Sequence, residues 1–128
     1  ASLVTAFEAF EHFLNPIEEM ERLLNMSPNI LLTTTLAPRP APKPSDWWYY
    51  GLDHGQHLGF YRVETLEYLA NRFGLNLLSD GSSTHLFSKK KYSSARWTVL
   101  RILARYVPKS LTNGLISKTW SDSRTLAE

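Results

Sequence analysis

Acidic and imidazole side chains gather near the start of the chain, in the stretch Leu3–His12 (LVTAFEAFEH). Four residues that suit a buried strand open the stretch, and Glu8, Glu11 and His12 follow within five positions. An apolar run that ends in acids and a histidine is typical of the carboxyl end of a parallel strand where a site lies. Carboxylate oxygens and imidazole nitrogens bind divalent cations, so these three side chains are candidate metal ligands.

The histidines also have interpretations without a metal, and the spacing leaves them open. Glu11 and His12 could merely shape the loop, with the His12 ring hydrogen-bonded inside the protein. Alternatively, His12 or His57 is a candidate general base, because histidine as a residue type titrates near neutrality. His54 lies three positions before His57 in a glycine-flanked loop, and we expect at least one of the two to face an active cleft. The alternative is a structural histidine that is hydrogen-bonded to the backbone. His85 falls in an expected strand, and we expect it to be structural.

A run of four aromatic residues, Trp47–Tyr50, offers flat surfaces for an acceptor molecule. Such a run can form a wall or lid over a flat or sugar-like molecule. Alternation along the chain predicts that at least one pair of the four instead packs in the core. The candidate substrate-binding residues are Trp47, Trp48, Tyr50, His54 and Tyr61.

The first third of the chain predicts a strand–helix–strand unit with the acids at the end of its first strand. Leu3–Phe7 is apolar enough for a buried strand, and Ile30–Leu36 (ILLTTTL) is rich in β-branched and apolar residues. Between them, Asn15 is a favoured helix N-cap and Pro16 is a favoured first helical residue. Apolar residues then recur at helical spacing, which predicts a helix over about Pro16–Met26.

The later part of the chain predicts a stiff connector, a long loop and further regular elements. Four prolines between Ala37 and Pro44 exclude a helix or a central strand and favour an extended connector. The stretch Asp46–Gly59 is expected to be a long ordered loop, and such loops are usually functional. The elements expected after it are a helix over Arg62–Phe73, a hairpin of Leu75–Leu78 and Thr84–Ser88, and a helix over Ser93–Tyr106.

The composition excludes several classes of protein. A length of 128 residues with 43% hydrophobic and 20% charged residues suits one globular domain with a real core. No run approaches the roughly 18 apolar residues of a membrane span, and nothing resembles a signal peptide. The absence of cysteine excludes disulfides and thiolate chemistry, which fits a cytoplasmic protein.

Charge is distributed unevenly along the chain, although the net charge of +2 does not by itself imply a nucleic-acid partner. From Ser88 to the end there are nine basic and two acidic residues, so a mildly acidic body carries a basic tail. The tail is a candidate surface for nucleic acid or for an anionic membrane. The alternative is a solvated helix, with Arg101 and Arg105 one turn apart, that packs Trp97 and its apolar neighbours on the domain.

Two stretches, FEAFEHFLNPIEEMERLL and GQHLGFYRVETLEYLANRFGLNLL, resemble segments of class I S-adenosylmethionine-dependent methyltransferases. The resemblance is to the broad family that includes ubiquinone-biosynthesis O-methyltransferases and many sugar, lipid and natural-product methyltransferases, and it covers about Ser2–Lys90. It implies an α/β fold, namely part of a Rossmann-like methyltransferase sheet with two parallel strands, an antiparallel C-terminal hairpin and flanking helices. Residues 1–90 would then form the C-terminal half of a methyltransferase-like domain, and residues 91–128 a basic helical extension.

The resemblance also implies a cofactor, an acceptor and a set of site residues. The cofactor is S-adenosylmethionine, and Ala6, Phe7 and Glu8 occupy the position where the family's strand touches it, mostly through backbone. The acceptor is a small or sugar-like molecule. The small-RNA 2′-O-methyltransferases carry a similar Glu-x-x-Glu-His with a later histidine and use these residues as metal ligands. By that likeness, the ligands of a Mg²⁺ or Mn²⁺ ion that polarises an acceptor hydroxyl are Glu8, Glu11, His12 and His57.

One departure from the family's pattern concerns the cofactor site. That site depends on a glycine-rich turn after an N-terminal strand, and none of the six glycines of this chain forms such a turn between strand and helix. We therefore expect a fragment that carries the acceptor-side half, is inactive alone and belongs to a longer methyltransferase. Its opening strand would have an unpaired edge open to self-association. The alternatives are a non-catalytic binding or assembly module with this fold and, ranked last, an unrelated metalloenzyme.

Overall fold

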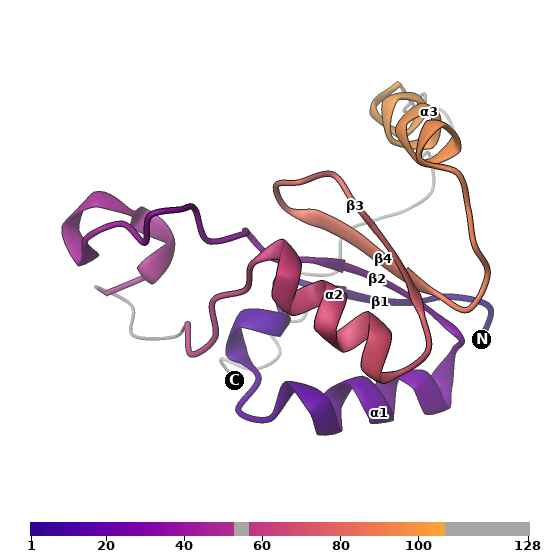
Figure 1. Cartoon of the computed structure of the whole chain (residues 1–128), viewed down its shortest axis with the longest axis horizontal. Coiled ribbons are helices and arrows are strands. Elements are labelled where there is room, and N and C mark those ends of the chain that lie inside the picture. The colour runs from indigo at the N-terminus through magenta and orange to yellow at the C-terminus, as the bar shows by residue number, and fades with distance from the viewer. Residues whose placement is uncertain (53–56, 107–128) are drawn as a thin grey trace, which may run out of the picture. The chain divides into compact units, whose positions relative to one another are not determined.

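A computed structural model of the chain describes residues 1–52 and 57–106 (Figure 1). It comprises one compact unit, Ala1–Trp97, and a second unit that begins at Thr98. A boundary between a half-domain and a basic extension near residue 90 stays a prediction. The strands are β1 (Val4–Phe7), β2 (Asn29–Thr33), β3 (Asn76–Ser79) and β4 (Thr84–Ser88); the α-helices are α1 (Pro16–Met26), α2 (Val63–Arg72) and α3 (Ser94–Arg105); and the short 3₁₀ turns are η1 (Phe10–His12), η2 (Pro44–Asp46) and η3 (Trp48–Tyr50).

The four strands form one mixed sheet in the order β1-β2-β4-β3 (Figure 1). β1 and β2 run parallel, with Val4 opposite Ile30 and Phe7 opposite Thr33. β4 pairs antiparallel with both β2 and β3. The expected fold class is confirmed: an α/β sheet with two parallel strands and an antiparallel hairpin, flanked by helices.

One face of this sheet carries the hydrophobic core of the first unit. Ile30, Leu32 and Phe87 are fully buried on it, because alternate residues of paired strands point to the same face. α1 and α2 contribute Met20 and Leu66 to the same buried cluster. The helices and the sheet therefore share one core, which fixes the ends of the strands in space.

The carboxyl ends of β1 and β2 lie next to each other and lead into the candidate site. Regular pairing of β2 ends at Thr33, three residues earlier than predicted. The amides of Thr34 and Leu36 nevertheless donate hydrogen bonds of 3.0 and 2.8 Å to carbonyls of the turn between β3 and β4, so the chain stays extended there. After β1, the backbone turns sharply at Glu8, whose φ is 47°, and η1 follows.

β1 forms one edge of the sheet within the described residues. Leu3 and Phe7 are exposed at this edge. An edge strand with open backbone groups can pair with another chain. The self-association expected from the sequence stays a prediction.

Candidate functional site

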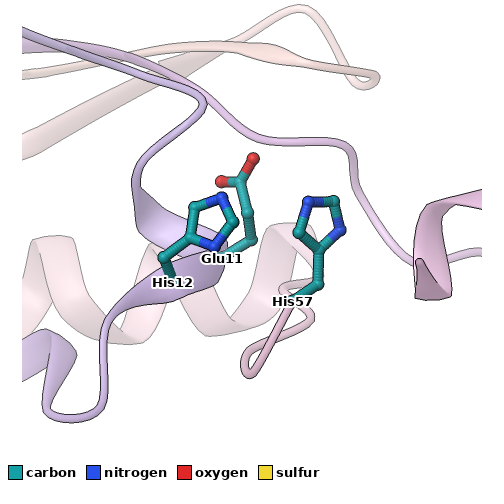
Figure 2. Close-up of side chains that lie close together, drawn as sticks. All are labelled: Glu11, His12 and His57. Atoms are coloured by element: carbon teal, nitrogen blue, oxygen red, sulfur yellow. The ribbon is translucent and has the colours of Figure 1, made fainter. Parts of the chain in front are cut away.

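Three predicted site residues converge just past the carboxyl end of β1, namely Glu11, His12 and His57, here called the Glu11 cluster (Figure 2). One donor atom from each lies within 4.8 Å of the other two. The rings of His12 and His57 meet edge to face, with centroids 5.0 Å apart. Figure 2 shows the three side chains lying side by side, from two separate segments of the chain. One carboxylate and two imidazoles together form a donor set that suits a cation.

Hydrogen bonds to the backbone of η1 bring these two segments together. The carbonyl of Glu11 accepts hydrogen bonds from the amides of Leu58 and Gly59 at 2.7 and 2.9 Å. The hydroxyl of Tyr61 donates to the carbonyl of Phe10 at 2.9 Å. Gly59 has little room for a side chain, because an added Cβ would lie 3.1 Å from the Tyr61 hydroxyl oxygen. This segment is therefore held against η1, and it carries the second imidazole of the cluster.

The Glu11 side chain is fully buried, with 0% exposure. Neither of its carboxylate oxygens has a hydrogen-bond partner among the described residues. Buried polar atoms in native proteins are nearly always paired, and a buried charge needs a counter-charge. A cation held beside the two imidazoles would satisfy both oxygens.

The imidazole of His57 is oriented by the backbone of Tyr49. Nδ1 of His57 lies 2.6 Å from the Tyr49 carbonyl oxygen. A carbonyl only accepts hydrogen bonds, so Nδ1 carries the hydrogen and Nε2 of the neutral ring keeps its lone pair. A hydrogen bond of this kind sets the tautomer of metal-binding histidines. Nε2 of His57 is therefore suited to bind a cation or to accept a proton.

Tyr49 lies buried beside the cluster and links it to the end of β2. Its ring packs on His57 with centroids 4.5 Å apart. Its hydroxyl lies 3.2 Å from Thr34 Oγ1 and accepts a hydrogen bond from the Thr35 amide at 3.1 Å. Burial raises the pKa of Tyr49, the contacts with Thr34 and Thr35 lower it in part, and the nearby Glu11 carboxylate raises it further. The phenol therefore stays neutral and connects the chain after β2 to η3.

Glu8, the fourth predicted ligand, lies outside the Glu11 cluster. Its exposed carboxylate accepts a hydrogen bond from the Thr33 hydroxyl at 2.7 Å. The same hydroxyl accepts a hydrogen bond from the Glu8 amide at 3.0 Å. The left-handed turn at Glu8, which is rare for a residue other than glycine, directs its side chain to the end of β2.

Some of the remaining predicted site residues are buried in the core and others are exposed on the surface. Ala6 is buried in the core, whereas Phe7 is 56% exposed. Tyr61 is buried, and burial followed by the nearby Glu11 and Tyr49 raises the pKa of Tyr61 to about 12. Its hydroxyl therefore stays protonated and donates to the Phe10 carbonyl of η1, so Tyr61 helps to hold η1 in position.

In the aromatic run one residue is buried, not the pair that alternation predicted. Trp48 is 80% exposed, whereas the next residue, Tyr49, is buried. Trp47 and Tyr50 are half-buried and pack around Phe60, with centroids 5.6 and 5.0 Å from its ring. Of the predicted substrate-binding residues that the structure describes, Trp48 is the most accessible. The remaining one, His54, lies outside the described residues.

The structure adds Thr34 and Thr35 to the site as residues that the sequence did not single out, and it adds Tyr49, which was predicted only as part of the aromatic run. Alternation predicted that at least one aromatic pair packs in the core, whereas only Tyr49 is buried. The threonines belong to the run ILLTTTL, where β-branched residues are already explained as strand formers. Their hydrogen bonds to Tyr49 depend on a contact across about fifteen residues, and no local pattern reveals it.

Comparison with known proteins gives one match. A family model described as a methyltransferase domain matches residues 1–80. No curated protein and no solved structure matches the chain. The matched span includes β1, α1, β2, α2 and β3, and all three residues of the Glu11 cluster.

Proposed function

Because the chain belongs to the methyltransferase domain family, we propose that it carries the acceptor-side half of an S-adenosylmethionine-dependent methyltransferase. The acceptor is a small or sugar-like molecule that is methylated on a hydroxyl group. The observation that carries this proposal is the Glu11 cluster, where a buried carboxylate that lacks a hydrogen-bond partner among the described residues lies beside two imidazoles. It lies past the carboxyl end of a parallel strand, where α/β sheets commonly bind their ligands.

The cluster fits a divalent cation. Two ligands at about 2.1 Å from one ion are at most about 4.2 Å apart. Small side-chain rotations would therefore close a group that now lies within 4.8 Å. Imidazole nitrogens favour Mn²⁺ over Mg²⁺, because Mg²⁺ prefers oxygen ligands alone. Glu11, His12 and His57 would hold the ion, and the ion would lower the pKa of the acceptor hydroxyl.

The backbone around the cluster supplies the positioning that the reaction needs. The Tyr49 carbonyl holds the Nδ1 hydrogen of His57 and so keeps Nε2 available to the cluster. The Tyr61 hydroxyl, whose pKa is raised to about 12, keeps donating to Phe10 and holds η1 in place. S-adenosylmethionine, when bound, supplies an electrophilic methyl group on its sulfonium. Methyl transfer then needs little beyond alignment of the acceptor oxygen with that group, so rigid positioning is the main task of the chain.

Exposed residues near the cluster are the proposed contacts of acceptor and donor. Trp48 directly precedes Tyr49, and its open indole ring suits the face of a sugar or another flat molecule. Phe7 and Glu8 are exposed at the end of β1, where the family resemblance implies contact with S-adenosylmethionine. Ala6 is buried, so its part in that contact would come from its backbone.

Calorimetric titration of S-adenosylmethionine tests the proposed function. The ligand is titrated, with and without Mn²⁺, into this chain and into a form extended upstream in its gene. We expect binding to the extended form, where a glycine-rich turn would be supplied, and little or none to this chain alone. The absence of binding to either form would contradict the proposed activity and favour a non-catalytic module.

A transfer assay with labelled methyl groups and polyhydroxylated acceptors then separates the two roles of the cluster. Transfer by the extended form that rises with Mn²⁺ and is lost with a chelator would support the cation. If neither Mn²⁺ nor the chelator changes the rate of transfer, the result would instead support Nε2 of His57 as the general base that takes the hydroxyl proton.

A further inference from the structure

We propose that the segment Lys89–Tyr106 binds an anionic membrane surface, with α3 lying in the plane of that surface. The segment contains six basic and no acidic residues. Three of the six, Lys89 to Lys91, are exposed directly before α3. A cluster of this size attracts anionic lipid headgroups, and each lysine or arginine near the surface adds to the attraction.

α3 also exposes an apolar surface. Binding through charge alone would not need such a surface, so it is a second, independent feature of the segment. Its residues Val99, Leu100, Ile102 and Leu103 are between 50% and 58% exposed. At 3.6 residues per turn, these four positions centre on the side of the helix opposite Arg101. A helix with one apolar side and one basic side lies at the membrane interface, with the apolar side turned into the lipid.

The combination of charge and apolar exposure favours a lipid surface over other partners. Nucleic acid would pair with the cations but would leave the four apolar side chains in water. A second copy of the chain could cover the apolar side, but it would bring two strongly basic segments together. An anionic bilayer complements both features. Arg96 lies nearer the apolar side, and its long stem can carry the guanidinium group to the headgroups.

The proposed contact is with one surface of the bilayer. No helix in residues 1–52 and 57–106 is long and apolar enough to cross a membrane. α3 has 12 residues and carries arginines along its length, as an interfacial helix does.

Vesicle sedimentation with the whole chain tests this proposal. The probes are vesicles of phosphatidylcholine alone and of phosphatidylcholine mixed with phosphatidylserine. We expect binding to the mixed vesicles only, and weaker binding as salt is added, because salt screens exposed charges. Equal binding to both kinds of vesicle, or binding to neither, would overturn the proposal.

Two variants separate the basic and apolar contributions. The triple change Lys89→Ser, Lys90→Ser and Lys91→Ser should weaken binding on the order of a hundredfold. The double change Ile102→Ser and Leu103→Ser should weaken it by about tenfold or more, because less apolar area enters the lipid. Matched controls outside the segment are Leu14→Ser and Lys43→Ser, which alter exposed residues and should bind like the unchanged chain.

Two further results would overturn the proposal and identify another partner. Tight binding to single-stranded RNA that survives the Ile102→Ser and Leu103→Ser change, without vesicle binding, would assign the charges to nucleic acid. A dimer seen by light scattering and lost in that same variant would assign the apolar side to a second copy. All changed residues are exposed, and circular dichroism would verify that each variant keeps its fold.

Discussion

Nδ1 of His57 and the carbonyl oxygen of Tyr49 lie 2.6 Å apart, and this hydrogen bond determines which ring nitrogen can act in the Glu11 cluster. The carbonyl can only accept, so the hydrogen of the neutral ring lies on Nδ1. The hydrogen bond joins two parts of the Asp46–Gly59 loop, and the rings of the same two residues also pack on each other. In the ligand-free protein, this hydrogen bond leaves Nε2 of His57 with a free lone pair that can bind a cation or accept a proton.

Nitrogen NMR should detect this tautomer directly. In long-range proton–nitrogen correlation spectra of the neutral ring, Nδ1 of His57 is expected as the protonated nitrogen and Nε2 as the unprotonated one. The reason is the acceptor at 2.6 Å from Nδ1. A spectrum with the hydrogen on Nε2 would contradict the hydrogen bond and would remove the lone pair from the cluster.

Replacing Tyr49 by phenylalanine should destabilise the fold while leaving the backbone contact to His57 intact. The change removes a hydroxyl that bonds to Thr34 Oγ1 and to the Thr35 amide. Since Thr34 is fully buried, the groups left unpaired should lower the free energy of unfolding by about 1–3 kcal/mol. Urea denaturation measures this loss.

A matched control for this change is Tyr68→Phe on α2. Tyr68 is exposed, so the control should change the free energy of unfolding by no more than about 0.5 kcal/mol. If the Tyr49 and Tyr68 variants lose equal stability, the hydroxyl of Tyr49 does not anchor the site.

Stability should fall as the pH drops below about 6.5, the usual pKa of histidine, because of His85. Its Nε2 donates to the Thr34 carbonyl at 3.1 Å, and its Nδ1 accepts from the Ser79 hydroxyl at 2.8 Å. Burial lowers the pKa of His85, an effect that the Thr34 contact and then Asp80 oppose. The unfolded chain therefore binds this proton at a higher pH than the folded chain does. The stability lost on acidification levels off below the folded-state pKa.

Urea midpoints at several pH values, in the unchanged chain and in His85→Gln, measure this contribution. Between pH 7.5 and pH 5, the free energy of unfolding should fall less in the variant than in the unchanged chain. The difference should be about what one histidine with a lowered pKa contributes. An identical decline in both proteins would show that other groups cause it.

The elements of the fold could largely be predicted, because their signals are local. The helix predicted over Pro16–Met26 matches α1 in both ends, since Asn15 caps it by accepting from the Glu18 amide at 3.5 Å. The hairpin turn is similarly local, with Asp80 Oδ1 accepting three amides of the residues that follow it. The predicted end of β2, Leu36, lies three residues beyond the observed end, Thr33, because the end of this strand depends on pairing with distant strands.

The candidate site could be predicted only in part. Spacing grouped Glu8 with Glu11, but the turn at Glu8 and its hydrogen bonds with Thr33 separate them, and these follow from the register of β1 and β2. His57 reaches the cluster through amides next to it that bond to the Glu11 carbonyl, a contact between distant parts of the sequence. No local pattern predicts such a contact, and only the family resemblance indicated it.

Titration of Mn²⁺ into this chain by calorimetry tests the central claim, that Glu11, His12 and His57 form the functional cluster. We predict one site, lost in Glu11→Gln and in His57→Gln and unchanged in Glu8→Gln, the matched control for a removed carboxylate. Mn²⁺ at about 100 times its dissociation constant should also stabilise the chain by about 2.7 kcal/mol. Loss of binding in Glu8→Gln with retention in Glu11→Gln, or no binding by the unchanged chain, would contradict the account.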